Sequence, residues 1–199
     1  EPMKHIHINY YYKDNRNIQV CKDVELINTF SILRTKLEQI ILGQVIVESL
    51  DKSTMENNSM PVLYKLVWRI LDKMNNQKLN CWMVFAFYLY QLSIRLGFKP
   101  NFTSCCKCNK FLDNAIIDDQ IGELICSSCN TQSKLILNEN SLIFLKNLDK
   151  MHLDEIQSPM ENTLEMFNAI NFLKVFNCFH LDGMDRVKSL DMINKLLKK

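Results

Sequence analysis

The sequence predicts a mainly α-helical protein, in which a helical bundle is preceded by a β-hairpin and interrupted by one cysteine-rich segment. Three observations support this prediction. Several long stretches repeat apolar residues at helical spacing. Only four glycines and four prolines occur in 199 residues, too few for the many turns of a β-sandwich or a barrel. Four of the eight cysteines form two closely spaced pairs within residues 102–134.

The hairpin is predicted over residues 4–21. Apolar and polar residues alternate from His5 onward, the polar run 13–17 supplies a turn, and a strand resumes at Ile18. An isolated hairpin is marginally stable, so this one should join a larger sheet or lean on the next part of the chain. Residues 10–12 are three tyrosines that can stack on single-stranded bases. Because neighbours in a strand alternate faces, at least one of them is expected in the core.

Two helices are predicted next. Apolar residues share one face over residues 29–51, and the polar stretch 52–59 is expected to be a loop. Pro61 opens the second helix, because proline suits a first helical position. Its apolar stripe has the spacing of a half-buried helix. The stripe consists of Leu63, Leu66, Val67, Ile70, Leu71 and Met74.

The helix predicted over about 80–96 is apolar nearly all round, which places it at the centre of the bundle. Gly97 and Pro100 end it, as a C′ glycine and a helix breaker do. Its longest apolar run is shorter than the roughly 20 residues that a bilayer span needs, and the polar start of the chain is no signal peptide. A reducing cytosol is therefore the expected setting.

Helices resume over 141–148, 162–180 and 190–198. In the second of these, Asn162 and Glu165 have the spacing of a capping box. These elements divide the chain into four parts. The parts are the hairpin region 1–27, a first helical part 28–101, the cysteine segment 102–134 and a second helical part 135–199.

The cysteine pattern predicts one structural zinc ion. Two residues separate the cysteines of each pair and seventeen separate the pairs, a spacing typical of a zinc ribbon. Each pair is followed by an asparagine, Asn109 or Asn130, a residue that tolerates the left-handed backbone such turns need. The predicted ligands are Cys105, Cys108, Cys126 and Cys129.

Alternatives remain at this segment. The four cysteines can instead be unligated buried residues or two disulfides, and Cys106 can be a bystander or an alternate ligand. A shell of four cysteines has no open position for a catalytic water. Between residues 104 and 133 two lysines face four acids, so the ribbon should repel phosphate. A structural or protein-docking role is therefore expected.

Basic residues are concentrated in the first helical part. Residues 60–100 hold six bases and one acid, whereas residues 139–170 hold two bases and six acids. Such a separation is typical of a surface for phosphates or an acidic peptide, although a merely solvated helix face is the plainer interpretation. The candidate binding residues are Lys65, Arg69, Lys73, Arg95 and Lys99. A secondary basic set comprises Arg186, Lys188 and Lys195, followed by Lys198 and Lys199.

The sequence contains no nucleophile elbow, phosphate loop, dinucleotide fingerprint or two-histidine zinc motif. None of the four histidines is spaced near a candidate nucleophile or acid. His180, at the end of an apolar helix, is expected to cap or pack rather than act as a base. The chain is therefore expected not to be an enzyme.

Several segments, in the right order, resemble the bacterial recombination mediator family RecO. They are residues 24–30, the run 96–100 ahead of the first cysteine pair, the run 122–125 ahead of the second pair, and residues 172–190. The similarity extends from about Tyr10 to the end of the chain.

The resemblance implies an N-terminal OB-fold followed by a helical domain with an inserted zinc ribbon. Since residues 1–27 hold only the last strands of such a fold, the chain, which starts without methionine, is expected to begin inside it. The implied function is mediation of recombination in DNA repair without catalysis, in the bacterial cytoplasm near the nucleoid. The implied partners are RecR, the acidic C-terminal tail of the single-strand-binding protein SSB, and single-stranded DNA, with RecA loading as the outcome.

Two other functions are considered. A zinc-stabilised adaptor would contact proteins only and would not retain DNA. An enzyme supported by a ribbon, as in sirtuin-like deacylases, would need a glycine-rich nucleotide fold for which the sequence has no room.

Overall fold

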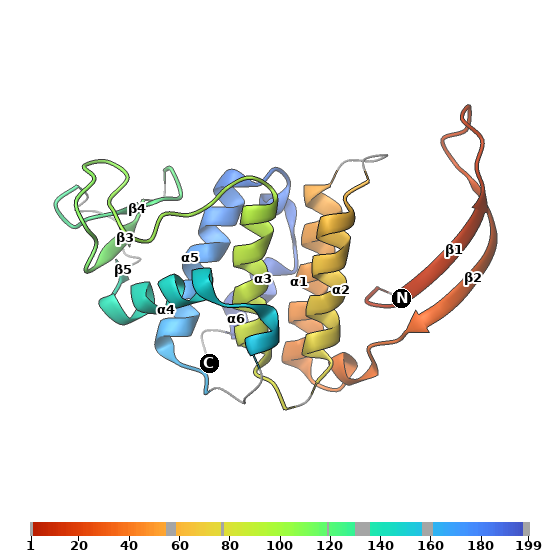
Figure 1. Cartoon of the computed structure of the whole chain (residues 1–199), viewed down its shortest axis with the longest axis horizontal. Coiled ribbons are helices and arrows are strands. Elements are labelled where there is room, and N and C mark those ends of the chain that lie inside the picture. The colour runs from red at the N-terminus through yellow and green to blue at the C-terminus, as the bar shows by residue number, and fades with distance from the viewer. Residues whose placement is uncertain are drawn as a thin grey trace.

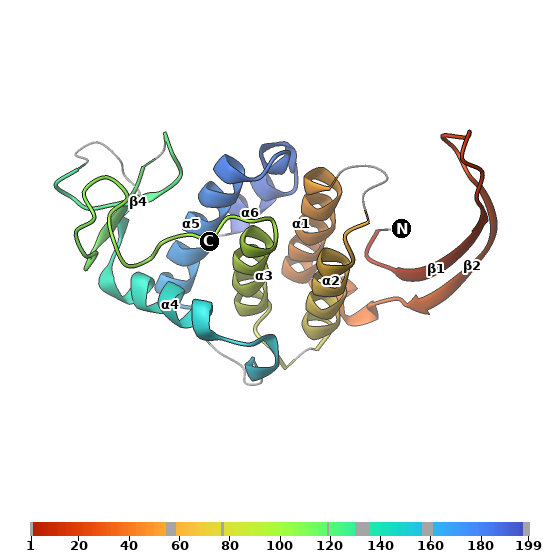
Figure 2. The ribbon, with the colours of Figure 1, turned by 45° about the horizontal axis from the view of Figure 1, so that its top comes forward.

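The structure is a computed structural model, and it describes residues 2–54, 59–76, 78–118, 120–129, 136–156 and 161–196. It confirms a mainly helical chain with a β-hairpin at one end and a four-cysteine module at the other (Figure 1). The view turned by 45° shows the same separation (Figure 2). No helix in these ranges is both long and apolar enough to cross a membrane.

The bundle consists of α-helices and 3₁₀ turns, and the cysteine segment with its strands lies between α3 and α4. The helices are α1 (Leu37–Ser53), α2 (Pro61–Met74), α3 (Cys81–Arg95), α4 (Glu139–Lys150), α5 (Leu164–His180) and α6 (Leu190–Leu196). The 3₁₀ turns are η1 (Ser31–Arg34), η2 (Leu153–Glu155) and η3 (Met184–Arg186).

Helix α3 lies at the centre, as its all-round apolar sequence predicts. It packs against α1, α2, α4 and α5, and most of its side chains are buried. Two buried polar side chains around it form hydrogen bonds: the Tyr88 hydroxyl lies 2.6 Å from Ser49 Oγ, and the Asn177 side-chain amide donates to the Leu89 carbonyl. Asn80 caps the helix, and Gly97 follows it with φ of 96°.

Helix α2 also agrees with prediction. Pro61 occupies its first turn, and all six residues of the predicted stripe are buried. The adjoining prediction of one helix over 29–51 is partly wrong, because η1 and an extended Lys36 precede α1. Phe30 adopts a left-handed conformation, and the Asn75 side chain accepts hydrogen bonds from the η1 backbone. A residue distant in the sequence thus holds residues 31–34 as a 3₁₀ turn instead of as the start of the α-helix.

Three element ends differ from prediction. Helix α5 begins at Leu164, since Thr163 rather than Asn162 caps it, and the Asn162 side chain instead accepts from Asn80. Helix α4 is longer than predicted because the side chain of Asn138 caps it. Part of the expected loop 52–59 is the end of α1, and its residues 55–58 lie outside the described ranges, as do 197–199 of the last predicted helix.

The hairpin pairs β1 (His5–Tyr11) with β2 (Val20–Asn28) in antiparallel register, with Ile8 opposite Val24. The second strand is longer than predicted, and residues 21–28 continue it. Contacts near its base hold the hairpin: Met3 lies against Gly43, and the Tyr64 hydroxyl lies 2.6 Å from His5 Nε2. The ribbon otherwise extends away from the bundle (Figure 1).

Residues 10–12, the three tyrosines, are all more than half exposed, at 55, 59 and 67%. The expectation that one of them lies in the core is therefore wrong. The reason is that neither face of the ribbon is covered at that point by another part of the described chain. The apolar strand residues are correspondingly exposed on both faces.

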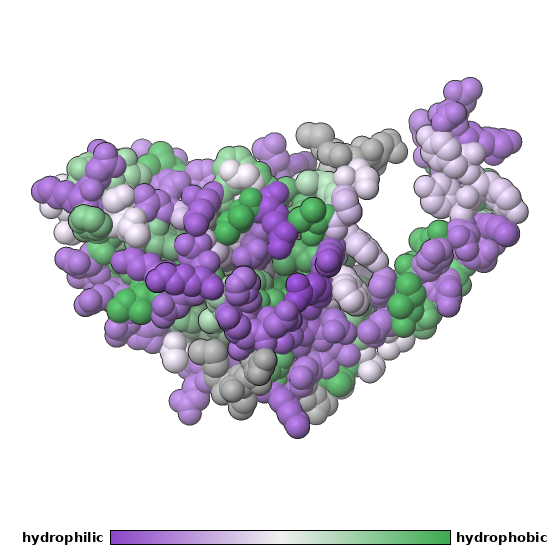
Figure 3. Space-filling model, viewed as in Figure 1, coloured by the Kyte–Doolittle hydropathy of each residue, from purple (hydrophilic) through white to green (hydrophobic). Residues whose placement is uncertain are grey.

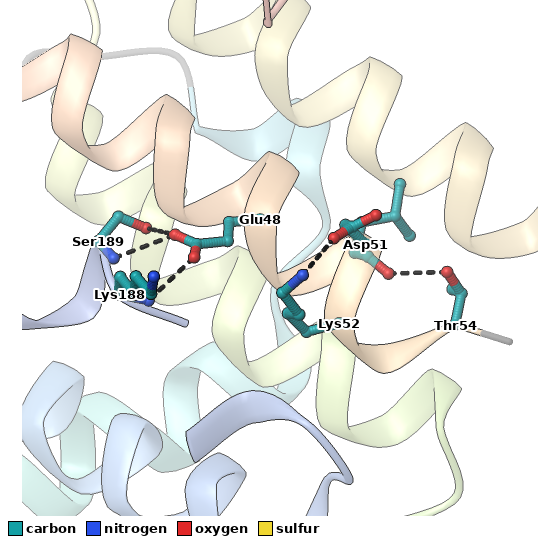
Figure 4. Close-up of polar contacts among 7 residues, drawn as sticks. Glu48, Asp51, Lys52, Thr54, Lys188 and Ser189 are labelled. Carbon is teal, nitrogen blue, oxygen red and sulfur yellow. Dashed lines mark hydrogen bonds and ion pairs between the residues drawn. The ribbon is translucent and has the colours of Figure 1, made fainter. Parts of the chain in front are cut away.

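Glu48 of α1 fixes the start of α6. Its carboxylate accepts hydrogen bonds from the backbone N–H groups of Lys188 and Ser189, both at 3.0 Å, and from Ser189 Oγ at 2.5 Å. Figure 4 shows these contacts beside the Asp51–Lys52 ion pair near the end of α1. A single side chain thus ties the last helix to the first across the bundle.

Candidate functional site

The cysteine segment folds around a small antiparallel sheet. Its strands are β3 (Ala115–Ile117), β4 (Leu124–Ile125) and β5 (Ile136–Leu137), in the order β4-β3-β5. The buried side chains of Ala115, Ile117 and Leu124 give the module an apolar interior that joins the main core. The two cysteine turns project from this sheet.

The four predicted ligands lie together. The sulfur atoms of Cys105, Cys108, Cys126 and Cys129 are all within 4.8 Å of one another. The Sγ atoms of Cys108 and Cys126 are 3.6 Å apart. A tetrahedral zinc–thiolate shell with bonds of about 2.3 Å places its sulfurs roughly 3.8 Å apart. The cluster can therefore hold one metal ion, and its all-sulfur donor set suits zinc.

The first cysteine turn has the backbone that its sequence predicts. Asn109 adopts φ of 59°, and its N–H donates to the Cys105 carbonyl at 2.9 Å. The Cys105 N–H in turn donates to the Lys110 carbonyl at 2.8 Å. The left-handed role predicted for Asn109 is confirmed, whereas Asn130 lies outside the described residues.

Local donors favour a thiolate at Cys105. Burial raises the pKa of its thiol, but the surrounding backbone N–H groups, first that of Cys126, outweigh burial and lower the pKa to about 6. Cys106 is exposed, and partial burial of its sulfur together with the negative charge of Cys105 raises its pKa. Among the described residues Cys106 is not part of the four-sulfur cluster. The geometry favours a bystander over an alternate ligand.

The module is held against the end of α5. The centroid of the His180 ring lies 4.3 Å from that of Phe176 on the same helix. The His180 Nε2 atom lies 3.4 Å from the carboxylate of Glu123 in the module. Gly122 adopts φ of 68° and lies so close to Phe179 that an added Cβ would sit 2.6 Å from Phe179 Cβ. His180 is thus a packing residue, as predicted, and burial lowers its pKa.

One cationic cavity of about 400 Å³ opens between α2, α3 and the segment after α4. Lys65, Arg69 and Arg95 line it together with Asp154. Arg69 binds the Asp154 carboxylate through two hydrogen bonds of 2.8 and 2.9 Å. The remaining walls are mainly apolar: Val62, Leu66, Phe87, Met151 and Leu153, with Gln91 and His152. We call this the arginine cavity.

A second cavity of about 470 Å³ lies between α4 and the linker that leaves α3. Its cations are Lys99, Lys146 and Lys150, and its acid is Asp149. Asp149 accepts a short hydrogen bond from the Tyr90 hydroxyl and pairs with Lys99 at 2.9 Å, and these partners lower its pKa. We call this the lysine cavity.

The predicted basic residues are therefore divided. Lys65, Arg69 and Arg95 meet at the arginine cavity, Lys99 lies at the lysine cavity, and Lys73 lines neither. The secondary set lies elsewhere, on η3, α6 and the residues between them. Its members are Arg186, Lys188 and Lys195, while Lys198 and Lys199 lie outside the described residues.

Sequence reasoning missed Lys146 and Lys150. Both belong to the stretch 139–170, whose net charge is negative, so the stretch as a whole gave no sign of a cationic site. Their spacing of four residues within an amphipathic helix was the available signal, because it places both on one side of α4.

The fold and the site together define a mainly helical protein that carries an inserted four-cysteine module able to bind metal. A family model described as "Recombination protein O C terminal" matches residues 34–173. The chain therefore belongs to the RecO family, which confirms the resemblance found in its sequence.

Relatives in three bacteria carry the name DNA repair protein RecO. The protein of Syntrophomonas wolfei is 22% identical over 182 residues, covering 86% of this chain and 72% of the relative. That of Pelodictyon phaeoclathratiforme is 21% identical, covering 95% and 77%. That of Salinibacter ruber is 29% identical over 100 residues, covering 50% and 38%.

Proposed function

We propose that the chain is a non-catalytic mediator of recombination in DNA repair, which binds single-stranded DNA and SSB and helps to load RecA together with RecR. Membership of the RecO family over residues 34–173 is the observation that carries this proposal. The names of the relatives support a role in DNA repair and, with it, a cytoplasmic location near the nucleoid.

The metal of the proposal is one structural Zn²⁺ held by Cys105, Cys108, Cys126 and Cys129. Four thiolates fill a tetrahedral shell, so the ion would stabilise the module without activating water. The support is the sulfur geometry. The module would then fix the linker that leaves α3.

The arginine cavity is the proposed site for the acidic tail of SSB. Lys65 and Arg95 pair with no carboxylate among the described residues, and a guanidinium matches a carboxylate with two hydrogen bonds. The apolar walls would receive the tail's apolar side chains. Arg69 already forms an ion pair with Asp154, so its proposed role is to neutralise that acid rather than to bind the tail itself.

The hairpin is proposed to be the last two strands of an OB-fold. Its apolar residues, exposed on both faces, are the support, since a strand pair buried in a sheet needs such residues. The exposed tyrosines at 10–12 would then add stacking surface for single-stranded DNA.

A protein-only adaptor is the second candidate. The described part of the cysteine module carries Asp113, Asp118 and Glu123 against Lys107 and Lys110, and its thiolates would add negative charge even with zinc bound. Such a surface suits a basic protein partner rather than phosphate.

Binding measurements across a salt series separate the two functions. Fluorescence anisotropy would follow a labelled single strand and a labelled SSB tail peptide, each with and without zinc. The proposed mediator binds both, with an affinity that falls steeply as salt rises. A chain that binds neither ligand at low salt, yet retains a protein partner only when zinc is present, is the adaptor.

A double variant, Lys65→Gln with Arg95→Gln, tests the arginine cavity. It leaves Arg69 in place, because removing Arg69 would leave the Asp154 carboxylate without its ion-pair partner. Peptide binding should weaken at least tenfold, while the exposed pair Lys36→Gln with Lys78→Gln serves as a control of equal charge. Unchanged peptide binding in the cavity variant would show that the tail binds elsewhere.

A further inference from the structure

The lysine cavity carries positive charge that the described protein does not use. The acid in it, Asp149, is already satisfied by Tyr90 and Lys99. The charge of Lys150 also acts on Asp149, but no described carboxylate forms an ion pair with Lys146 or Lys150. Two ammonium groups therefore remain available on the side of α4 that faces the linker.

The floor of this cavity is apolar and firmly held. Pro100 and Phe102 are buried, and the Phe102 ring packs 5.7 Å from that of Tyr90 and 6.0 Å from that of Phe172. The Asn101 side chain accepts hydrogen bonds from the Thr103 N–H and hydroxyl at 2.9 and 2.8 Å. A ligand would meet a surface that is already ordered, which lowers the entropy lost on binding.

The cations of the two cavities differ in kind. Among the lining residues, the lysine cavity has three lysines and no arginine, whereas the arginine cavity has two arginines and one lysine. A planar guanidinium binds carboxylate or phosphate through paired hydrogen bonds of fixed geometry, whereas an ammonium is a compact charge on a flexible stem that binds anionic oxygens from many directions. The lysine cavity therefore suits a flexible polyanion whose charged groups need no single fixed geometry.

The cavities also adjoin. Lys150 of the lysine cavity is followed directly by Met151 of the arginine cavity, and Arg95, the last residue of α3, lies four positions before Lys99. In Figure 3 hydrophilic residues extend from α4 across the neighbouring helices to α2. Because cations line both cavities, an extended polyanion on this face would meet more than one of them.

We propose that the lysine cavity binds the phosphate backbone of single-stranded DNA, with Lys146 and Lys150 contacting phosphates and the floor of Pro100 and Phe102 packing against sugar or base; this rests on the proposed DNA-binding function. The cavity has a volume of about 470 Å³, and a flexible single strand can bend to follow its lining. The single-stranded DNA would thus cross the junction of the bundle and the cysteine module, at a distance from the β-hairpin.

The test is the salt dependence of single-strand binding by the double variant Lys146→Gln, Lys150→Gln. A plot of log K against log salt has a negative slope, and each lost phosphate contact should make it shallower by about 0.7. Losing two contacts should make it shallower by about 1.4 and weaken binding severalfold at low salt. Binding of the SSB tail peptide should stay as in the wild type. The charge-retaining pair Lys146→Arg, Lys150→Arg should keep most of the DNA affinity.

The pair Lys36→Gln, Lys78→Gln is the matched control, since both lysines are exposed near the N-terminal ends of α1 and α3, away from the cavity. An equal loss of slope in both pairs, or no loss in the cavity pair, overturns the assignment of this cavity while leaving the proposed function standing. Failure of the wild-type chain to bind single-stranded DNA overturns both.

Discussion

Arg69 donates two hydrogen bonds to the carboxylate of Asp154, a residue 85 positions further along the chain. The arginine belongs to the basic stretch of the sequence and the aspartate to the acidic stretch. Their pairing brings the two stretches together at the arginine cavity and removes one acid from the charge that a ligand would meet there.

Removing that acid should strengthen peptide binding. In Asp154→Asn the guanidinium of Arg69 is released, and the affinity for the SSB tail peptide should rise severalfold. The free energy of unfolding should change by less than about 1 kcal/mol, because the Asp154 side chain is 77% exposed and that of Arg69 is 41% exposed. Asp72→Asn, an exposed acid of the same helix as Arg69, is the control; equal tightening by both variants would argue against a cavity effect.

Glu48→Gln should destabilise the fold, because the amide cannot accept all three hydrogen bonds that the carboxylate receives from Lys188 and Ser189 (Figure 4). A loss of roughly 1–3 kcal/mol is expected from denaturant unfolding. Glu38→Gln, in the exposed first turn of the same helix, should change stability by less than about 1 kcal/mol. Similar effects of the two substitutions would show that the α6 contact contributes little.

The same contact predicts a pH dependence. Partial burial raises the pKa of Glu48, but hydrogen bonds from Ser189 and Lys188 outweigh it and lower the pKa below its usual 4.5. The folded state thus binds this proton less tightly than the unfolded state, so the contribution is complete above pH 4.5 and is lost as pH falls below it. Glu48→Gln should flatten the acid limb of a stability curve, and an unchanged limb would contradict this origin.

Gly122→Ala should disrupt the attachment of the cysteine module to α5. The new Cβ would combine a left-handed backbone with a 2.6 Å approach to Phe179. Gly97→Ala has the same backbone penalty of about 1–2 kcal/mol but meets no atom within 4 Å. Thermal unfolding should show a clearly larger loss for Gly122→Ala, and equal losses would mean that Phe179 can move aside.

Cys126→Ser should abolish stoichiometric zinc and expose the module to proteolysis, because metal binding stabilises such small modules. The helical circular dichroism should largely persist, since most buried apolar side chains of the shared core lie in the helices rather than in the module. Cys106→Ser should retain zinc. Elemental analysis of the purified variants is the measurement, and loss of metal in the Cys106 variant would make that residue a ligand.

Sequence patterns were sufficient to predict those features that depend only on residues close together in the chain. The two closely spaced cysteine pairs bring four sulfur atoms within 4.8 Å of one another, and Asn109 adopts the left-handed backbone that the first turn needs. Helix α2 buries the stripe that its spacing predicts, because a regular helix turns a fixed angle per residue. These features need no knowledge of distant contacts.

Predictions failed where distant residues decide. Asn75 and the left-handed Phe30 interrupt the first helix, and Thr163 takes the cap because Asn162 contacts Asn80. The three tyrosines at 10–12 are exposed because the described chain places nothing over the ribbon at that point.

The sequence alone determined the helical class, the central helix and the four cysteines that cluster, since each follows from periodicity or spacing within one segment. Only the tertiary structure decided which cations share a cavity and which are neutralised. Charge is felt through space rather than along the chain, so Arg69 and Lys99 are balanced by acids from another segment, while Lys146 and Lys150 emerge from an acidic stretch as available cations.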